Sequence, residues 1–288
     1  MTYLTSRNVL FLIISLIVCT IYYAPLYELL MLSLYNNELY SHIVVIPFVS
    51  AYFIYIKRKE IFSGAGYDFL AGIIIIILGS LFYLVGLTQG NRLNENDYQS
   101  FVTFSVLVTW LGVFIFFYGV KTFKNARFPL LFLIFLIPIP SMLIEHLIDV
   151  LQKGSTEVAS VLFKFSGAPF LRDGFIFQLP GIAIEVAKEC SGIRSSISLF
   201  ITSIIAGQLF LNTGWRKIVL TLVIFPITIF KNGLRIVTLG LLGSYVNPEI
   251  LNTDVHKKGG IPFFFLSLMV LGVILWFLRR SEVQSSRN

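Results

Sequence analysis

The segment "FLAGIIIIILGSLFYLVGL", residues 69–87, decides the fold of this chain. It holds 19 consecutive residues without a charged side chain. An α-helix needs about 20 apolar residues to cross the hydrocarbon core of a bilayer, whereas a run of about 10–14 is more typical of a buried core helix. The segment therefore predicts a transmembrane helix.

The whole chain has the composition of a membrane protein. Of its 288 residues, 56% are hydrophobic and 13% are charged, whereas a soluble domain has roughly 25% charged residues. The formal net charge of +7 comes from short basic clusters between apolar runs. Nucleic-acid binding would need a continuous basic face. We therefore expect membrane lipid, and no nucleic acid, around this chain.

Further apolar runs along the chain resemble the first. The candidate spans are residues 8–24, 42–56, 69–87, 101–120, 128–144, 191–211, 218–239 and 261–278. We expect an all-α polytopic membrane protein with about eight transmembrane helices. The sequence indicates a single integral membrane domain, residues 1–288, whose core motifs lie within residues 128–278 and whose cytoplasmic tail is residues 279–288.

The charges assign the two faces of the membrane. Basic residues lie at Arg7 and within residues 57–59, 121–127, 216–217 and 279–280, all on one face of the expected topology, while the loops of the other face are acidic. Lys and Arg favour the cytoplasmic side. We therefore expect a protein of the plasma (inner) membrane with both termini in the cytoplasm and the acidic loops outside.

Two outer segments are longer than connectors need to be. Residues 141–165 place apolar residues among charged ones at a spacing that suits an amphipathic helix at the outer surface. Residues 167–190 follow, with Gly and Pro around two short stretches of alternating apolar residues. This pattern predicts a hairpin-like loop, and long ordered loops commonly carry function.

Three reactive side chains reach this outer face. Cys190 stands at the outer end of the sixth span, and His256 lies in the last outer loop. The seventh span starts at the inner face with Lys217, and Arg235 is 18 residues further on. This is roughly 27 Å along a helix, so Arg235 lies near the outer boundary. Each also has an ordinary explanation. Cys190 could be a small buried residue, Arg235 could extend to the lipid headgroups, and His256 could be a plain loop histidine. Their convergence favours a catalytic site.

The chemistry of these residue types fits acyl transfer. A thiol attacks carbonyls as the thiolate, whose formation is favoured by cations and helix N-termini; Arg194 lies one turn after Cys190. Arg235 or Arg194 could support the thiolate, and Arg235 and the N–H groups of Ser191 and Gly192 could bind an oxyanion. His256 could move the proton.

The same residues carry a family resemblance. The blocks "AKECSGIRSS", "KNGLRIV" and "HKKGGIPFF" occur in this order and resemble the signature blocks of the exosortase/archaeosortase family. The likeness extends to "YSHIVVIPFVSAYFIYIKRK", "RFPLLFLIFLIPIP" and "LRDGFIFQLP". By position, Cys190 matches the family nucleophile, Arg235 the arginine of the second block, and His256 the third member. Archaeal relatives tend to have arginine at that third place, so His256 indicates the bacterial branch.

The resemblance implies a membrane cysteine transpeptidase, a peptidase that transfers the acyl group. Its substrates would be secreted proteins with a C-terminal sorting signal (PEP-CTERM-like) of a short motif, a transmembrane helix and a basic tail, passed through a thioester to a surface acceptor. Supporting residues would be Arg194, Ser191, Gly192 and Asn232. Candidates for substrate binding are His42, Lys231, Glu189 and Arg172. We expect neither a metal nor a cofactor.

A non-enzymatic membrane component is the alternative. A transporter or polysaccharide-export component would use the intramembrane charges of Lys231 and Arg235 as an anion path. It would have no need of Cys190. The two hypotheses therefore differ in what they expect of one thiol.

Overall fold

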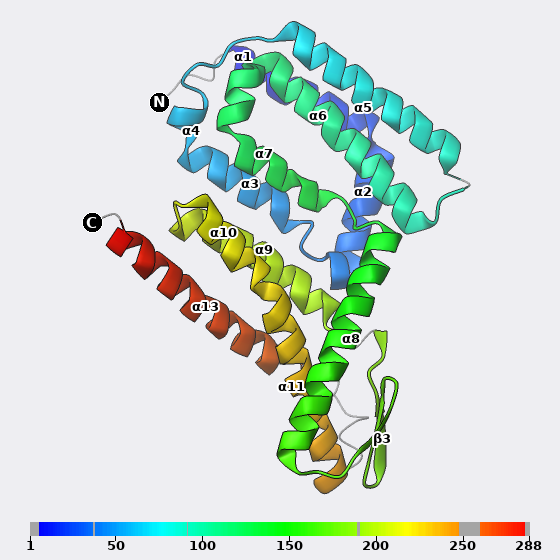
Figure 1. The fold of residues 1–288 in the computed structure, drawn as a ribbon. Helices are drawn as coiled ribbons and strands as arrows, with labels where there is room; N and C mark the ends of the chain where they lie inside the picture. The colour runs from blue at the N-terminus through cyan, green and yellow to red at the C-terminus, as the bar shows by residue number, and fades with distance from the viewer. Residues whose placement is uncertain (1–5, 37, 91, 189–190, 248–259, 286–288) are drawn as a thin grey trace. The chain divides into compact units, whose positions relative to one another are not determined.

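The computed structural model describes residues 6–36, 38–90, 92–188, 191–247 and 260–285 (Figure 1). The chain divides into two compact units, unit 1 with residues 1–143 and unit 2 with residues 144–288. Each unit is described by itself below. That residues 1–288 form a single integral membrane domain stays a prediction.

The structure confirms an all-α polytopic membrane protein. Five described helices are long and apolar enough to cross a membrane, or up to seven if two bent helix pairs each count as one span. The helix in the expected span 42–56 has 12 residues, which is shorter than a crossing needs. The total of eight spans, and their orientation in the membrane, stay predictions.

All the described secondary-structure elements of unit 1 are helices. Its elements are α1 (Ser6–Ile21), α2 (Tyr23–Met31), η1 (Leu32–Asn36), η2 (Glu38–Tyr40), α3 (Val45–Ile56), α4 (Arg58–Ile61), α5 (Phe69–Gln89), α6 (Glu95–Asn125), α7 (Arg127–Phe132) and η3 (Leu133–Leu136). Helices α1 and α2 with η1 form a pair bent by 77°. The side chains of Asp68 and Asn94 accept hydrogen bonds at the first turns of α5 and α6, as N-cap residues do.

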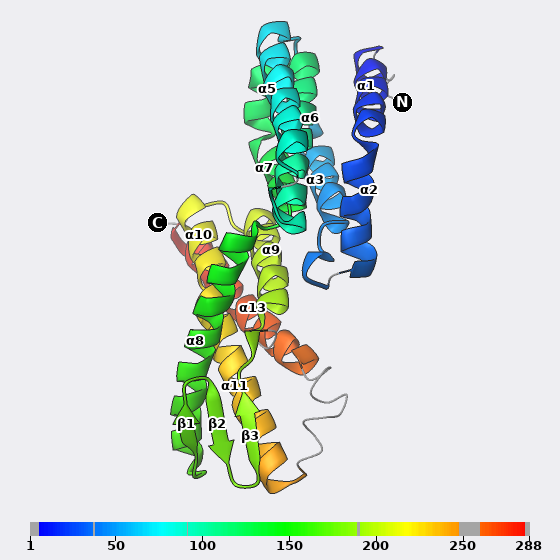
Figure 2. The ribbon, with the colours of Figure 1, turned by 90° about the vertical axis from the view of Figure 1, so that its right-hand side faces the viewer.

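Helices α5 and α6 pack side by side along their length (Figures 1 and 2). Glycines allow this close approach. A Cβ on Gly72 would lie 2.5 Å from Cα of Phe116, and a Cβ on Gly112 would lie 2.7 Å from the backbone nitrogen of Ile76. In lipid, where apolar surface gains little from leaving the solvent, such small-residue contacts hold helices together.

Hydrogen bonds connect the charged segments at the two ends of unit 1. At one end, Arg7 donates to the carbonyl of Ala65 and Asn125 to that of Glu60, which brings the basic segments together. At the other end, the carboxylate of Asp97 accepts from the backbone N–H of Ser141. The basic segments therefore meet at one end together with Glu60, whereas Arg92 lies just before the acidic first turn of α6 at the other end.

Unit 2 combines helices with a small sheet. Its elements are α8 (Ser141–Ser166, which begins in the last residues of unit 1), β1 (Leu171–Asp173), β2 (Ile176–Leu179), β3 (Ile182–Glu185), α9 (Ile193–Phe210), α10 (Gly214–Leu222), α11 (Ile224–Tyr245) and α13 (Gly260–Ser285). The helix expected over residues 141–165 is confirmed as α8. The expected hairpin is confirmed and extended, because a third strand makes an antiparallel sheet of order β1-β2-β3.

The sheet packs on α8 and α11 (Figure 2). Along β2, Phe177 and Leu179 are buried while Ile176 and Gln178 are exposed, the alternation of a strand with one covered face. Phe177 pairs across the strands with Ile184 and shares an apolar cluster with Phe163 of α8. This cluster fixes the segment that leads into the "ECSG" block.

The C-terminal helix extends into the expected tail. α13 continues to Ser285, whereas the sequence suggested a tail from residue 279. The carboxylate of Glu282 accepts the backbone N–H groups of Asn212 and Thr213 and lies 3.3 Å from Arg216. A carboxylate at a helix N-terminus is favourable, so Glu282 joins the end of α13 to the start of α10.

Candidate active site

Three of the proposed site residues lie outside the described residues. Cys190 and Glu189 fall in the gap between residues 188 and 191, and His256 falls in the gap between residues 247 and 260. The residues that adjoin these gaps are described, and they show how the three sequence blocks are arranged in unit 2.

Gly192 brings the "AKECSGIRSS" block into contact with the "KNGLRIV" block. It precedes α9 with a φ of 79°, a left-handed conformation that glycine adopts without a Cβ penalty. A Cβ at this position would lie 3.4 Å from Oδ1 of Asn232 and 3.5 Å from Nζ of Lys231. The backbone two residues after Cys190 therefore rests against the side chains that open the "KNGLR" block.

Lys231 is a buried cation with a defined partner. It is 5% exposed, and its ammonium group donates a hydrogen bond to the hydroxyl of Ser195 on α9. Ser195 in turn donates to the carbonyl of Gly192 at 2.9 Å. The hydroxyl of Ser196 donates to the same carbonyl at 2.7 Å. A buried charge needs such partners, and these connect α11 to the N-terminus of α9.

Arg235, in the "KNGLRIV" block, lies close to the "HKKGGIPFF" block. It lies one turn after Asn232 on α11 and is half-buried, while Asn232 is 1% exposed. A Cβ on Gly260, the first residue of α13, would lie 3.9 Å from Nη1 of Arg235. Gly260 is four residues beyond His256 in the sequence. The guanidinium group therefore lies where the third block enters its helix.

Ser191 is placed differently from our expectation. Its side chain is fully buried, and its backbone N–H donates to the carbonyl of Lys188 at 3.1 Å. Of the two N–H groups expected to bind an oxyanion, that of Ser191 is already engaged within the chain. Arg194, the other candidate cation, is exposed at the first turn of α9.

Arg172 forms an ion pair on the surface of unit 2. Its guanidinium donates two hydrogen bonds to Glu157 of α8, at 3.0 and 2.6 Å. These bonds lower the pKa of Glu157 and raise the pKa of Arg172. The pair holds β1 against α8. A role of Arg172 in substrate binding stays a prediction.

His42 lies in unit 1, between η2 and α3, and is half-buried. Its ring centroid is 6.5 Å from that of Tyr40. Its proposed role in binding substrate also stays a prediction. Within the part of the chain that the structure describes, no group of three or more His, Cys, Asp or Glu side chains is arranged to hold a metal ion.

Sequence reasoning did not anticipate the role of Ser195. The signal was present, because a lysine inside an apolar helix requires a polar partner and Ser195 and Ser196 end the cysteine block "AKECSGIRSS". The partner is supplied by another helix, so that spacing along the chain does not identify it.

The fold and the convergence of polar blocks define a helical membrane protein with a buried polar site in unit 2. The chain belongs to the transmembrane exosortase family (Exosortase_EpsH), which matches residues 34–273. The family resemblance drawn from the three blocks is thereby confirmed. No curated protein and no solved structure matches the chain.

Proposed function

We propose that this exosortase is a membrane-embedded cysteine transpeptidase with Cys190 as its nucleophile, Arg235 as its main cation and His256 as its proton carrier. The observation that carries the proposal is that the first and third blocks both approach the second block, which lies on α11. Gly192 rests against Lys231 and Asn232, and Gly260 lies beside Arg235. Cys190 and His256 lie two and four residues from those glycines.

The first half of the reaction forms a thioester. His256 accepts the thiol proton of Cys190, and the thiolate attacks the carbonyl carbon of the scissile peptide bond. Arg235 and the N–H of Gly192 bind the oxyanion of the tetrahedral intermediate. The C–N bond then breaks, and the leaving amine takes the proton from His256. The C-terminal part of the substrate departs with its new amino group.

The second half resolves the thioester. An acceptor nucleophile gives its proton to His256 and attacks the thioester carbonyl. When the intermediate collapses, the C–S bond breaks, the proton returns to sulfur and Cys190 is a thiol again. With a surface acceptor the outcome is transfer, and with water it is hydrolysis. The enzyme ends each cycle in the protonation state in which it began.

The cations around the site support this chemistry. Positive charge near a cysteine favours its thiolate, and Lys231 lies beside the backbone of Gly192. The substrates of this proposal are secreted proteins whose PEP-CTERM-like C-terminal signal includes a transmembrane helix and a basic tail. That helix would lie in the plasma (inner) membrane, with the motif at the outer face and the basic tail in the cytoplasm, where both termini of the enzyme lie.

Two alanine variants test the proposal. The chain has only two cysteines, Cys19 and Cys190, so Cys19→Ala is the matched control for Cys190→Ala. In cells that express a substrate with a C-terminal signal, we expect Cys190→Ala to abolish processing and Cys19→Ala to retain it. Both variants should insert into the membrane to the same extent, as measured by membrane fractionation. Full processing by Cys190→Ala would contradict the proposal and favour the transporter or export component.

A further inference from the structure

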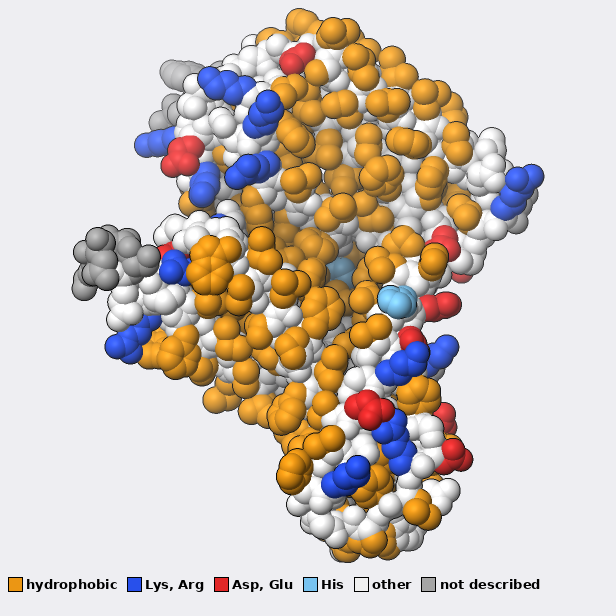
Figure 3. Space-filling model, viewed as in Figure 1, with side chains coloured by type: hydrophobic (Ala, Val, Ile, Leu, Met, Phe, Trp, Pro, Cys, Tyr) orange, Lys and Arg blue, Asp and Glu red, His pale blue; other side chains and the backbone are white. Residues whose placement is uncertain are grey.

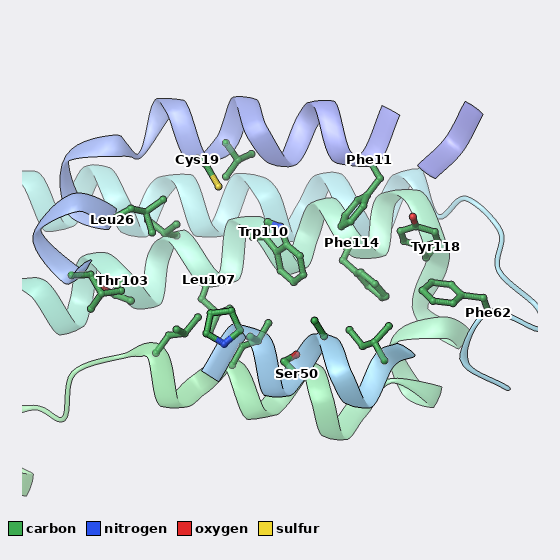
Figure 4. Close-up of a pocket in the computed structure, with 18 residues that line it drawn as sticks. Phe11, Cys19, Leu26, Ser50, Phe62, Thr103, Leu107, Trp110, Phe114 and Tyr118 are labelled. Atoms are coloured by element: carbon green, nitrogen blue, oxygen red, sulfur yellow. The ribbon is translucent and has the colours of Figure 1, made fainter. Parts of the chain in front are cut away.

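Unit 1 contains an apolar cavity that the peptidase chemistry does not use. Its volume is about 440 Å³, within the range of small-molecule sites. Figure 4 shows it between α1 and α3, with α6 behind it. Phe11, Phe62 and Tyr118 lie at one end, and Leu26 and Thr103 lie toward the other.

Two hydroxyl groups of the lining are engaged by the protein, while the hydroxyl of Thr103 is buried without a hydrogen-bond partner among the described residues. The hydroxyl of Ser50 donates to the carbonyl of Pro129 at 2.7 Å, and that of Tyr118 to the side chain of Asn8 at 3.1 Å. Most of the other lining residues are aliphatic or aromatic. The interior of the cavity therefore suits a hydrocarbon chain, and an apolar cavity does not hold ordered water.

The size of the cavity decides between a lipid chain and a helix. A transmembrane helix is about 10–12 Å wide and 30 Å long, a volume of roughly 2,400–3,400 Å³. The cavity offers about 440 Å³, a size typical of small-molecule sites and below that of a substrate helix. A single acyl chain is far thinner. Cys19, Pro47 and Ala51 line the cavity and are exposed, so the cavity opens beside α1 and α3.

Cations gather at the aromatic end of the cavity. Arg7 lies over the ring of Tyr118, 5.2 Å from its centroid. Nζ of Lys121 lies 3.0 Å from the position of a Cβ on Gly64, two residues from Phe62. Lys59 is exposed three residues before Phe62. We call Arg7, Lys59 and Lys121 the basic rim, and Figure 3 shows Lys and Arg side chains grouped at this end of unit 1.

We infer that unit 1 binds one anionic phospholipid, with an acyl chain in the cavity and the phosphate at the basic rim. In a bilayer the chain itself gains little from leaving other lipid, but an empty cavity leaves its lining without packing partners. Selection therefore comes from the headgroup. Basic pockets between transmembrane helices recognise anionic lipids in this way, with Lys and Arg as phosphate donors.

Quenching of tryptophan fluorescence tests this site. Trp110 lines the cavity, while Trp276 is an exposed residue of α13. One protein retains Trp110 alone (Trp215→Phe with Trp276→Phe) and the other Trp276 alone (Trp110→Phe with Trp215→Phe). Each is reconstituted in phosphatidylcholine bilayers with a small fraction of lipid with brominated acyl chains. The brominated lipid is either phosphatidylglycerol, which is anionic, or phosphatidylcholine.

We expect brominated phosphatidylglycerol to quench Trp110 at a mole fraction about tenfold lower than brominated phosphatidylcholine, since each rim cation contributes to binding. Trp276 lies beside Arg280 on the exposed surface of α13, so it should show a smaller difference between the two lipids, because a surface cation attracts anionic lipid without a cavity to hold the acyl chain. Equal quenching of Trp110 by the two lipids would overturn the inference, and this comparison needs no variant in the cavity or the rim.

Paired variants separate the cavity from the rim. In the Trp110 protein, Ala51→Phe should fill the cavity and reduce quenching by both lipids, while Leu84→Phe on the exposed face of α5 should not. Lys59→Gln with Lys121→Gln should remove the preference for phosphatidylglycerol, and Arg279→Gln with Arg280→Gln should retain it. Unchanged quenching in Ala51→Phe, or an unchanged preference in the rim variant, would contradict the site.

Discussion

Lys231 of α11 donates a hydrogen bond to the hydroxyl of Ser195 on α9. Through Ser195, the lysine is connected to the carbonyl of Gly192, two residues from the proposed nucleophile. The "KNGLR" block therefore does more than supply Arg235. It also holds the turn in which the cysteine block enters its helix.

The two members of this pair should respond differently to substitution. Ser195→Ala leaves the Lys231 ammonium buried without that partner, which should destabilise the protein by about 1–3 kcal/mol. Lys231→Met should cost less, because Ser195 still bonds to Gly192. Thermal unfolding in detergent measures both. Processing should be impaired in Lys231→Met despite its better stability. Normal processing in that variant would show that the lysine is only structural.

Gly192→Ala should impair processing through the backbone. A non-glycine residue at a φ of 79° is strained by about 1–2 kcal/mol. Gly181→Ala is the matched control, because Gly181 has a φ of 80° and open space around it. Both variants should lose similar stability in thermal unfolding, but only Gly192→Ala should lose processing. Equal processing in the two variants would show that the turn at Gly192 is not part of the active site.

Gly233→Ala should force α8 and α11 apart. Its Cβ would lie 2.6 Å from Cγ1 of Val158, and overpacking of this kind costs about 1–3 kcal/mol. Gly272→Ala in α13 meets nothing within 4 Å, so its better helix propensity should stabilise the protein by up to about 1 kcal/mol. The midpoint of thermal unfolding in detergent should fall for Gly233→Ala and rise for Gly272→Ala. A neutral Gly233→Ala would contradict the close helix contact.

Glu282→Gln should weaken the connection between α13 and α10. The substitution removes the charge that faces Arg216 and the N–H groups of Asn212 and Thr213. We expect a loss of about 1–3 kcal/mol, measured by thermal unfolding. In combination with Arg216→Met, the loss should be smaller than the sum of the single effects. Strict additivity would indicate that the pair does not interact.

The long helices were predictable because length and hydropathy alone determine a crossing. The expected spans 69–87 and 261–278 each fall within one described helix, α5 and α13, and the span 101–120 falls within α6, whose backbone is kinked at Gly119. The expected span 128–144 is divided, with η3 ending at Leu136 and α8 beginning at Ser141. Pro138 and Pro140 lie between them, and proline removes the N–H that would continue a helix.

The site was predictable in its residue types but not in its contacts. The spacing of Lys231, Asn232 and Arg235 places them within about one turn of a helix, which sequence reveals. That Gly192 and Gly260 approach this helix closely depends on how α9, α11 and α13 cross. Crossing geometry is set by packing of side chains far apart in the sequence. The cavity of unit 1 could not be predicted from the sequence for the same reason.

The most direct measurement of the central claim is to locate the acyl-enzyme. Membranes with the enzyme and a tagged substrate are quenched in acid, and the tagged adduct is mapped by mass spectrometry before and after treatment with neutral hydroxylamine, which cleaves thioesters. The account predicts a hydroxylamine-sensitive adduct on the peptide with Cys190 and none on the peptide with Cys19. Processing without an adduct on Cys190, or an adduct on another residue, would contradict it.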